Sequence, residues 1–165
     1  AAIDRDGWFH TGDAGYLKDS HLYLTERIKD LFKTSNGKYI SPQALETKLA
    51  IDRYIDQIAV IADERKFVSA LIVPVYGFVK DYAKEKGIAY SNMDELLQHP
   101  KIQALFRARI DTLQQQFAHY EQVKRFTLLT EPFSMERGEL TNTLKLKRSV
   151  VAKNYKGLID KMYEE

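Results

Sequence analysis

The stretch IAVIADERKFVSALIVPV, residues 58–75, decides the fold that this sequence predicts. It contains two apolar runs, residues 58–62 and 70–75, whose length is typical of buried β-strands. The polar residues 63–66 separate the runs, and a hairpin is the simplest connection between them. We therefore expect a pair of strands at the centre of the domain.

Smaller strands are expected upstream of this pair. Alternating apolar and polar residues indicate a strand at 21–28, and shorter extended pieces follow at 31–33 and 39–40. Asn36-Gly37, between the two short pieces, is a strong signal for a tight hairpin turn. Residues 125–129 predict a last strand.

Helices are expected before and after the central strands. Ser41 as N-cap and Pro42 as first helical residue predict one helix start, and Ser91 with Asp94 resembles a capping box at another. Apolar stripes at helical spacing predict three buried helix faces: Phe78, Val79, Tyr82 and Ala83; then Ile102, Phe106, Ile110, Leu113 and Phe117; and last, in a closing helix, Val151, Tyr155, Leu158 and Met162. The expected fold class is α+β, a small mixed sheet with a β-hairpin, covered by helices.

Composition excludes several classes of function. The 165 residues include 25 Lys and Arg against 23 Asp and Glu, so a net charge of +2 does not call for a nucleic-acid partner. Cysteine is absent, which removes disulfides and thiolate chemistry and fits a cytoplasmic location. No apolar run approaches the roughly 20 residues of a membrane span. The chain begins with Ala, and we expect it to be a fragment of a longer polypeptide.

Two segments carry candidate chemistry. Asp13 follows a Thr-Gly turn, and a carboxylate there can accept hydrogen bonds from a ribose diol while the guanidinium of Arg27 donates to it. The alternative is a turn aspartate that caps its own backbone and an exposed arginine on a strand.

In the second segment, six basic residues lie between 145 and 161 against one acid. They read either as a solvated helix face or, for Lys145 on its Gly- and Thr-containing loop, as a cation that reaches an anionic substrate.

Four stretches together resemble a known family. They are DGWFHTGD (6–13), YLTERIKD (23–30), KTSNGKYISP (33–42) and GELTNTLKLKR (138–148). The first three resemble the late core motifs of adenylate-forming enzymes, which include acyl-CoA synthetases, luciferases and peptide-synthetase adenylation domains. The last stretch resembles the version found in long-chain fatty acyl-CoA synthetases.

The resemblance implies a two-domain fatty acid–CoA ligase that uses ATP and CoA. Residues 1–28 would be the tail of the large N-terminal domain, and residues 29–165 a mobile C-terminal lid domain. Mg and most ATP contacts are expected in the N-terminal domain, as is the fatty-acid pocket, and no metal ligand is assigned in this chain. The resemblance leaves peripheral membrane association of the whole enzyme open. We expect the 165-residue chain alone to be inactive.

The resemblance also implies roles for single residues. Asp13 and Arg27 match nucleotide-binding residues, and Lys29 matches the hinge between the domains. The remaining matches are Ser35 and Gly37, in the loop that lines the CoA tunnel, and Lys145, the catalytic lysine of acyl-adenylate formation. Leu144 departs from the pattern, because short-chain relatives carry Gly before that lysine.

Two alternatives stay open. The first is a relative that loads the acyl group onto a carrier protein instead of CoA. The second is a non-catalytic module whose basic C-terminal face meets RNA or a protein partner.

Overall fold

The structure, a computed structural model, describes residues 3–164, except for the side chains of Thr25, Glu26 and Lys29. Its centre is a three-stranded sheet with the order β5-β6-β7. Strand β5 (Ile55–Ile61) pairs antiparallel with β6 (Val68–Pro74), and β6 pairs parallel with β7 (Val123–Leu128). This confirms the hairpin predicted from residues 58–75.

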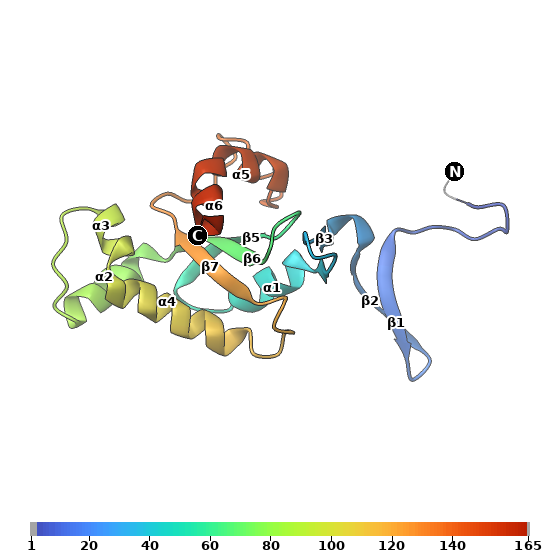
Figure 1. Cartoon of the computed structure of the whole chain (residues 1–165), viewed down its shortest axis with the longest axis horizontal. Coiled ribbons are helices and arrows are strands. Elements are labelled where there is room, and N and C mark those ends of the chain that lie inside the picture. Colours follow the sequence, from blue (N-terminus) through green and yellow to red (C-terminus); the bar gives the residue numbers. More distant parts are fainter. Residues whose placement is uncertain (1–2, 165) are drawn as a thin grey trace.

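Helices cover both faces of the sheet (Figure 1). Side chains that alternate along β5 point to opposite faces, because successive residues of a strand do so. Ile58 and Val60 therefore join one apolar cluster, with α1 (Pro42–Leu49), α2 (Tyr76–Glu85), α3 (Met93–Gln98) and α4 (Pro100–Leu113). Ala59 joins the other, with α5 (Arg148–Asn154) and α6 (Lys156–Tyr163). The predicted α+β class, a small mixed sheet covered by helices, is confirmed.

Two small hairpins precede this body. Strand β1 (Asp13–Lys18) pairs with β2 (His21–Arg27), and β3 (Phe32–Lys33) pairs with β4 (Tyr39–Ile40). A single 3-10 turn, η1 (Ile28–Asp30), joins the two hairpins. The hairpin of β1 and β2 extends away from the body at one end of the molecule (Figure 1).

Helix α1 begins at the residues predicted from the sequence. Ser41 accepts a hydrogen bond from the amide of Ala44, and Pro42 begins the helix. Leu45 and Leu49, one turn apart, are both fully buried. Residues 36–37 turn the chain between β3 and β4, also as predicted.

Four local predictions are wrong. Phe78, expected on the buried face of α2, is 40% exposed, and its ring centre lies 5.2 Å from the guanidinium of Arg53. The N-cap of α3 is Asn92 rather than Ser91, because the Asn92 side chain accepts from the amide of Glu95 while the Glu95 carboxylate accepts from the amide of Ser91. Helix α4 ends at Leu113, before Phe117. The side-chain amide of Gln114 bonds both backbone groups of Val123 just beyond this end: its Nε2 donates to the Val123 carbonyl, and its Oε1 accepts from the Val123 amide.

The predicted closing helix is interrupted. Tyr155 separates α5 from α6 and has φ −104° and ψ 18°, outside the helical region. The interruption changes which side chains face the sheet, so Ile159 is buried while Leu158 is 37% exposed. Val151 and Met162 are buried as expected.

Candidate functional site

Asp13 and Arg27 lie opposite each other in the register of β1 and β2. The guanidinium Nε of Arg27 is 3.2 Å from a carboxylate oxygen of Asp13, and the two side chains are 70% and 26% exposed. Gly12, with φ +77°, turns the chain immediately before Asp13, whose amide donates to the Thr11 hydroxyl at 3.1 Å. The hairpin thus places a hydrogen-bond acceptor and a forked donor side by side at the surface, paired with each other.

The joint between the hairpins is short. Lys29 is the middle residue of η1, between Arg27 and Leu31, which both have extended backbones (ψ 132° and 134°). The Lys29 side chain lies outside the described part of the structure. Because the joint is a single 3-10 turn between two extended residues, rotation about only a few backbone torsions changes the direction of the chain there.

The loop with Ser35 and Gly37 rests on the turn between β5 and β6. The amide of Ser35 donates to the carbonyl of Arg65 at 3.0 Å, and the amide of Glu64 donates to that of Lys33 at 2.8 Å. Gly37 has φ +75°, a backbone conformation that favours glycine. Backbone hydrogen bonds therefore hold this loop on the body and leave Ser35 and Gly37 exposed.

Lys145 lies at the end of a tight loop. The amide of Thr141 donates to the carbonyl of Lys145 at 2.8 Å, and the amide of Lys145 donates back to the Thr141 hydroxyl at 3.0 Å. Leu144 has φ +60°, a backbone conformation that favours glycine. The Lys145 side chain is exposed, and within residues 3–164 its ammonium group has no hydrogen bond or ion pair.

The base of this loop contains a buried acid that the sequence analysis did not select. The Glu139 side chain is 1% exposed and forms an ion pair with Arg137 at 3.1 Å. Arg137 also donates to the carboxylate of Glu131 at 3.1 Å and to the carbonyl of Pro132. The one signal in the sequence is the opposite charge of Arg137 and Glu139 on either side of Gly138.

Hydrogen bonds decide the charge state of Glu139. Burial raises the pKa of this carboxyl, but donors from Arg137, Asn154 and the amide of Ser134 outweigh burial and hold the pKa below its ordinary value of 4.5. The group is therefore a carboxylate at neutral pH, with its charge balanced inside the fold.

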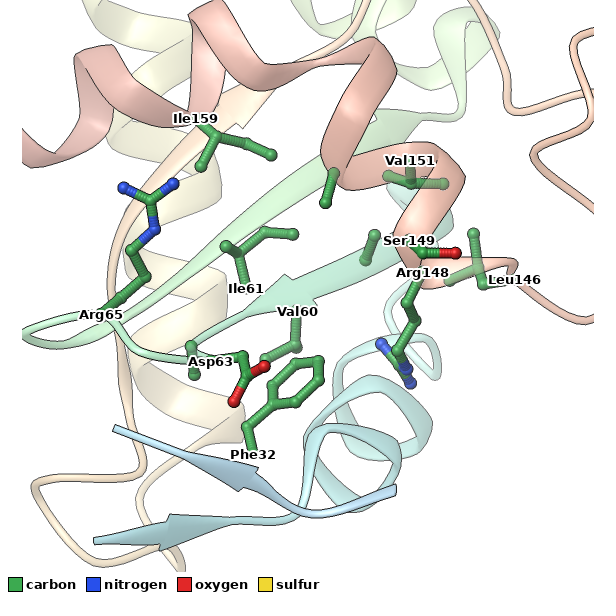
Figure 2. A pocket seen from close by; sticks show the side chains of 13 residues that line it. Phe32, Val60, Ile61, Asp63, Arg65, Leu146, Arg148, Ser149, Val151 and Ile159 are labelled. Carbon is green, nitrogen blue, oxygen red and sulfur yellow. The ribbon is translucent and has the colours of Figure 1, made fainter. Parts of the chain in front are cut away.

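A cavity of about 320 Å³ lies between β3, the turn after β5, and the helices α5 and α6 (Figure 2). Ile61, Val151 and Ile159 give it apolar walls, and two arginines stand at its sides. Both guanidinium groups already bind carboxylates, Arg65 with Asp160 at 3.0 Å and Arg148 with Glu46 at 2.6 Å. The cavity therefore offers an anion little uncompensated charge.

The predicted site residues fall into separate groups. Asp13 and Arg27 form one pair, whereas Ser35 and Gly37 lie on the β3–β4 loop and Lys145 on the loop before α5. Among residues 3–164, no hydrogen bond or ion pair joins Lys145 to the pair. No group of three or more metal-ligating side chains lies together in the described range, and none of its helices has the length and apolarity of a membrane span.

Comparison with protein families matches residues 29–165 to the AMP-binding enzyme C-terminal domain. The chain is 35% identical over 167 residues to peroxisomal long chain acyl-CoA synthetase 7 of Arabidopsis thaliana, covering 99% of this chain and 24% of that protein. It is 36% identical over 169 residues to long-chain-fatty-acid–CoA ligase 5 of Rattus norvegicus, covering 98% of this chain and 24% of that protein. The chain thus spans about a quarter of the length of these curated relatives.

Solved structures show the same fold. The adenylation domain of a carboxylate reductase from Mycobacterium chelonae has a TM-score of 0.78 and 24% identity, over 99% of this chain and 24% of that one. The adenylation domain of the carboxylic acid reductase from Segniliparus rugosus, in complex with AMP and a co-purified carboxylic acid, has a TM-score of 0.77 and 22% identity, over 98% and 24% of the two chains.

Proposed function

Because this chain belongs to the family of AMP-binding enzyme C-terminal domains, we propose that it is the C-terminal part of an ATP-dependent long-chain fatty acid–CoA ligase. Relatives that are 35% and 36% identical along nearly the whole chain carry long-chain acyl-CoA synthetase and ligase names. In the proposed reaction, a fatty-acid carboxylate attacks the α-phosphate of ATP and releases pyrophosphate. The thiol of CoA then attacks the acyl carbonyl and releases AMP.

One observation carries this proposal: an exposed lysine without a described partner stands on a loop that its backbone closes tightly. The first step brings two anions together, so a cation placed between them lowers its barrier. An ammonium already committed to an ion pair would have to break it first. Lys145 is free to supply its charge to a nucleotide bound outside this chain.

The second step requires a different arrangement. CoA must reach the carbonyl that Lys145 approached, so the lysine has to withdraw between the steps. We assign this movement to Lys29, and we assign Ser35 and Gly37 to the surface along which the pantetheine of CoA passes. The short turn η1 supports the hinge, and the exposed, backbone-bonded loop supports the tunnel surface.

We also propose a domain boundary between residues 28 and 29. We assign residues 1–28 to the tail of an N-terminal domain and residues 29–165 to the mobile lid. The family match over residues 29–165 supports this division, as do the exposed apolar side chains of Tyr16, Leu17 and Leu24 on the preceding hairpin. Such side chains are typical of a surface that another part of a protein covers.

The paired side chains of Asp13 and Arg27 are assigned to nucleotide binding. We assign Asp13 to accept hydrogen bonds from the ribose hydroxyls of ATP, and Arg27 to donate to the same nucleotide. We also assign Mg and the remaining ATP contacts to the N-terminal domain, as the resemblance to adenylate-forming enzymes implies. We also propose a cytoplasmic location for the whole enzyme, which the absence of cysteine from this sequence supports.

The basic binding module is less well supported. Arg148 and Lys156 lie within the basic segment, but Arg148 binds Glu46 and Lys156 lies 3.7 Å from Asp160. A surface that neutralises part of its charge internally offers fewer cations to phosphates.

Pyrophosphate exchange by the full-length protein tests the proposed function. We expect ATP–pyrophosphate exchange that depends on long-chain fatty acids, followed by thioester formation with free CoA. Thioester formation with a holo-carrier protein but not with CoA would favour the carrier-loading alternative. Absence of exchange with fatty acids of every chain length would overturn the proposal.

A further inference from the structure

The charged side chain of Glu139 lies at the base of the Lys145 loop, where an apolar residue would be the ordinary choice. Both oxygens of its carboxylate accept hydrogen bonds from neighbouring donors. One oxygen accepts from Ser134 N at 3.0 Å and the other from the Asn154 side chain at 3.1 Å, while Arg137 Nε lies 3.1 Å from both. Replacing a buried ion pair by well-packed apolar side chains is often neutral or stabilising, so stability alone does not explain a charged side chain at this position.

The backbone of Glu139 continues this arrangement into the loop. Its carbonyl accepts from the amide of Lys147 at 2.8 Å, and Leu140 forms a bridge with Leu146. Thr141 then closes on Lys145. Each residue from 139 to 141 is thus paired with one on the returning arm of the loop, and Lys145 is reached through three successive pairs.

The side chain of Glu139 fixes where this paired loop points. Asn154 belongs to the end of α5, and Ser134 belongs to the segment after β7, so the carboxylate joins the loop to both. Without the carboxylate, the base of the loop loses its bonds to Arg137, Asn154 and Ser134, so the three backbone pairs above it open more often and Lys145 loses its fixed position. A displacement of about 1 Å at a reacting group lowers a rate by as much as 10²-fold.

We infer that Glu139 is a positioning residue for acyl-adenylate formation, because it orients the Lys145 loop on the body of the domain. This inference rests on the proposed function. Glu139 does not reach the substrates, since its carboxylate is enclosed by Arg137, Asn154 and Ser134. Its effect is confined to the step in which Lys145 acts.

Asp52 provides a matched control. Its side chain is 6% exposed, and its carboxylate binds the Arg109 side chain at 2.7 Å. This pair joins the loop after α1 to α4, which packs on the opposite face of the sheet from α5 and α6. Glu139→Gln and Asp52→Asn each remove a carboxylate charge from a side chain that is less than 10% exposed, but only the first lies at the Lys145 loop.

The experiment uses the full-length protein and two readouts. In Glu139→Gln, we expect acyl-adenylate formation to fall about 10-fold to 100-fold, while thioester formation from supplied acyl-adenylate and CoA stays within about twofold. We also expect the amides of residues 140–147 to exchange hydrogen faster in Glu139→Gln and to be unchanged in Asp52→Asn. Asn154→Ala removes one donor at a more exposed position and should cause the same changes at smaller size, so it serves if Glu139→Gln folds poorly.

The outcomes separate the two proposals. Unchanged hydrogen exchange in residues 140–147, or a fall of both half-reactions by the same factor in Glu139→Gln, would overturn the role of Glu139. Absence of acyl-adenylate formation in the unaltered protein would overturn the proposed function, whereas the exchange readout would still test whether Glu139 orients the loop.

Discussion

Arg148 binds both carboxylate oxygens of Glu46, with each nitrogen–oxygen distance 2.6 Å. Glu46 lies in α1 and also accepts from the amide of Val60 at 2.8 Å, so the pair joins α1, β5 and the start of α5. The same guanidinium lies 5.4 Å from the ring centre of Phe32, in the hairpin that carries the proposed CoA loop. One arginine thus connects the returning arm of the Lys145 loop to the sheet and to β3.

Arg148→Ala should destabilise the fold. The pair is largely buried, with side chains 30% and 13% exposed, and its loss leaves Glu46 without its cation. We expect the free energy of unfolding in urea to fall by about 2 kcal/mol. Lys153→Ala, which removes an exposed cation from the same helix, should change it by less than about 0.5 kcal/mol. An equal change in the free energy of unfolding for both substitutions would show that the ion pair of Arg148 with Glu46 does not stabilise the fold.

Asp13→Ala should weaken binding of ATP. The substitution removes a charged acceptor and leaves Arg27 without its 3.2 Å partner. We expect the KM for ATP to rise about 10-fold in the full-length protein, with a smaller change in kcat. Asp6→Ala, at an exposed position in the same segment, is the control. An unchanged KM would remove Asp13 from the nucleotide site.

Gly37→Ala should slow thioester formation. Gly37 has φ +75°, and an added Cβ meets no atom within 4 Å, so the cost is backbone strain and not a clash. We expect the loop to shift and thioester formation from CoA to slow, while fatty-acid-dependent pyrophosphate exchange is retained. Gly157→Ala, in α6 and without a positive φ, is the matched control and should be neutral or stabilising. Loss of exchange in Gly37→Ala would argue against a role limited to CoA.

Lys29→Pro should separate the two half-reactions. Proline fixes φ and also restricts the preceding residue, so rotation at the proposed hinge becomes difficult. We expect acyl-adenylate formation to remain measurable and thioester formation to stop. Lys29→Ala, which leaves the torsions free, should support both steps. Normal turnover of CoA by Lys29→Pro would exclude this position as the hinge.

Elements with local signals could be predicted from the sequence. Ser41-Pro42 begins α1, residues 36–37 turn between β3 and β4, and the runs around residues 63–66 form the central hairpin, since each depends on neighbours along the chain. The start of α3 was misplaced by one residue because Ser91 and Asn92 both carry side chains that can cap a helix.

Long-range pairs could not be predicted in this way. Glu46 and Arg148 are 102 positions apart, and nothing in their local sequence indicates that they meet. The opposition of Asp13 and Arg27 depends on a bulge between Ala14 and Gly15 that shifts the register of β1 and β2, and the sequence predicts no strand at residues 13–18. The burial of Glu139 depends on α5 closing over the loop, so its local sequence does not predict it either.

Lys145 is the residue whose charge we assign to one half-reaction alone. The direct measurement is single-turnover kinetics of both steps in the full-length Lys145→Ala protein, with Lys147→Ala, another exposed cation nearby, as control. We predict that acyl-adenylate formation falls on the order of 10²–10³-fold, while thioester formation from supplied acyl-adenylate is retained. An equal loss in both steps, or no loss in the first, would contradict the account.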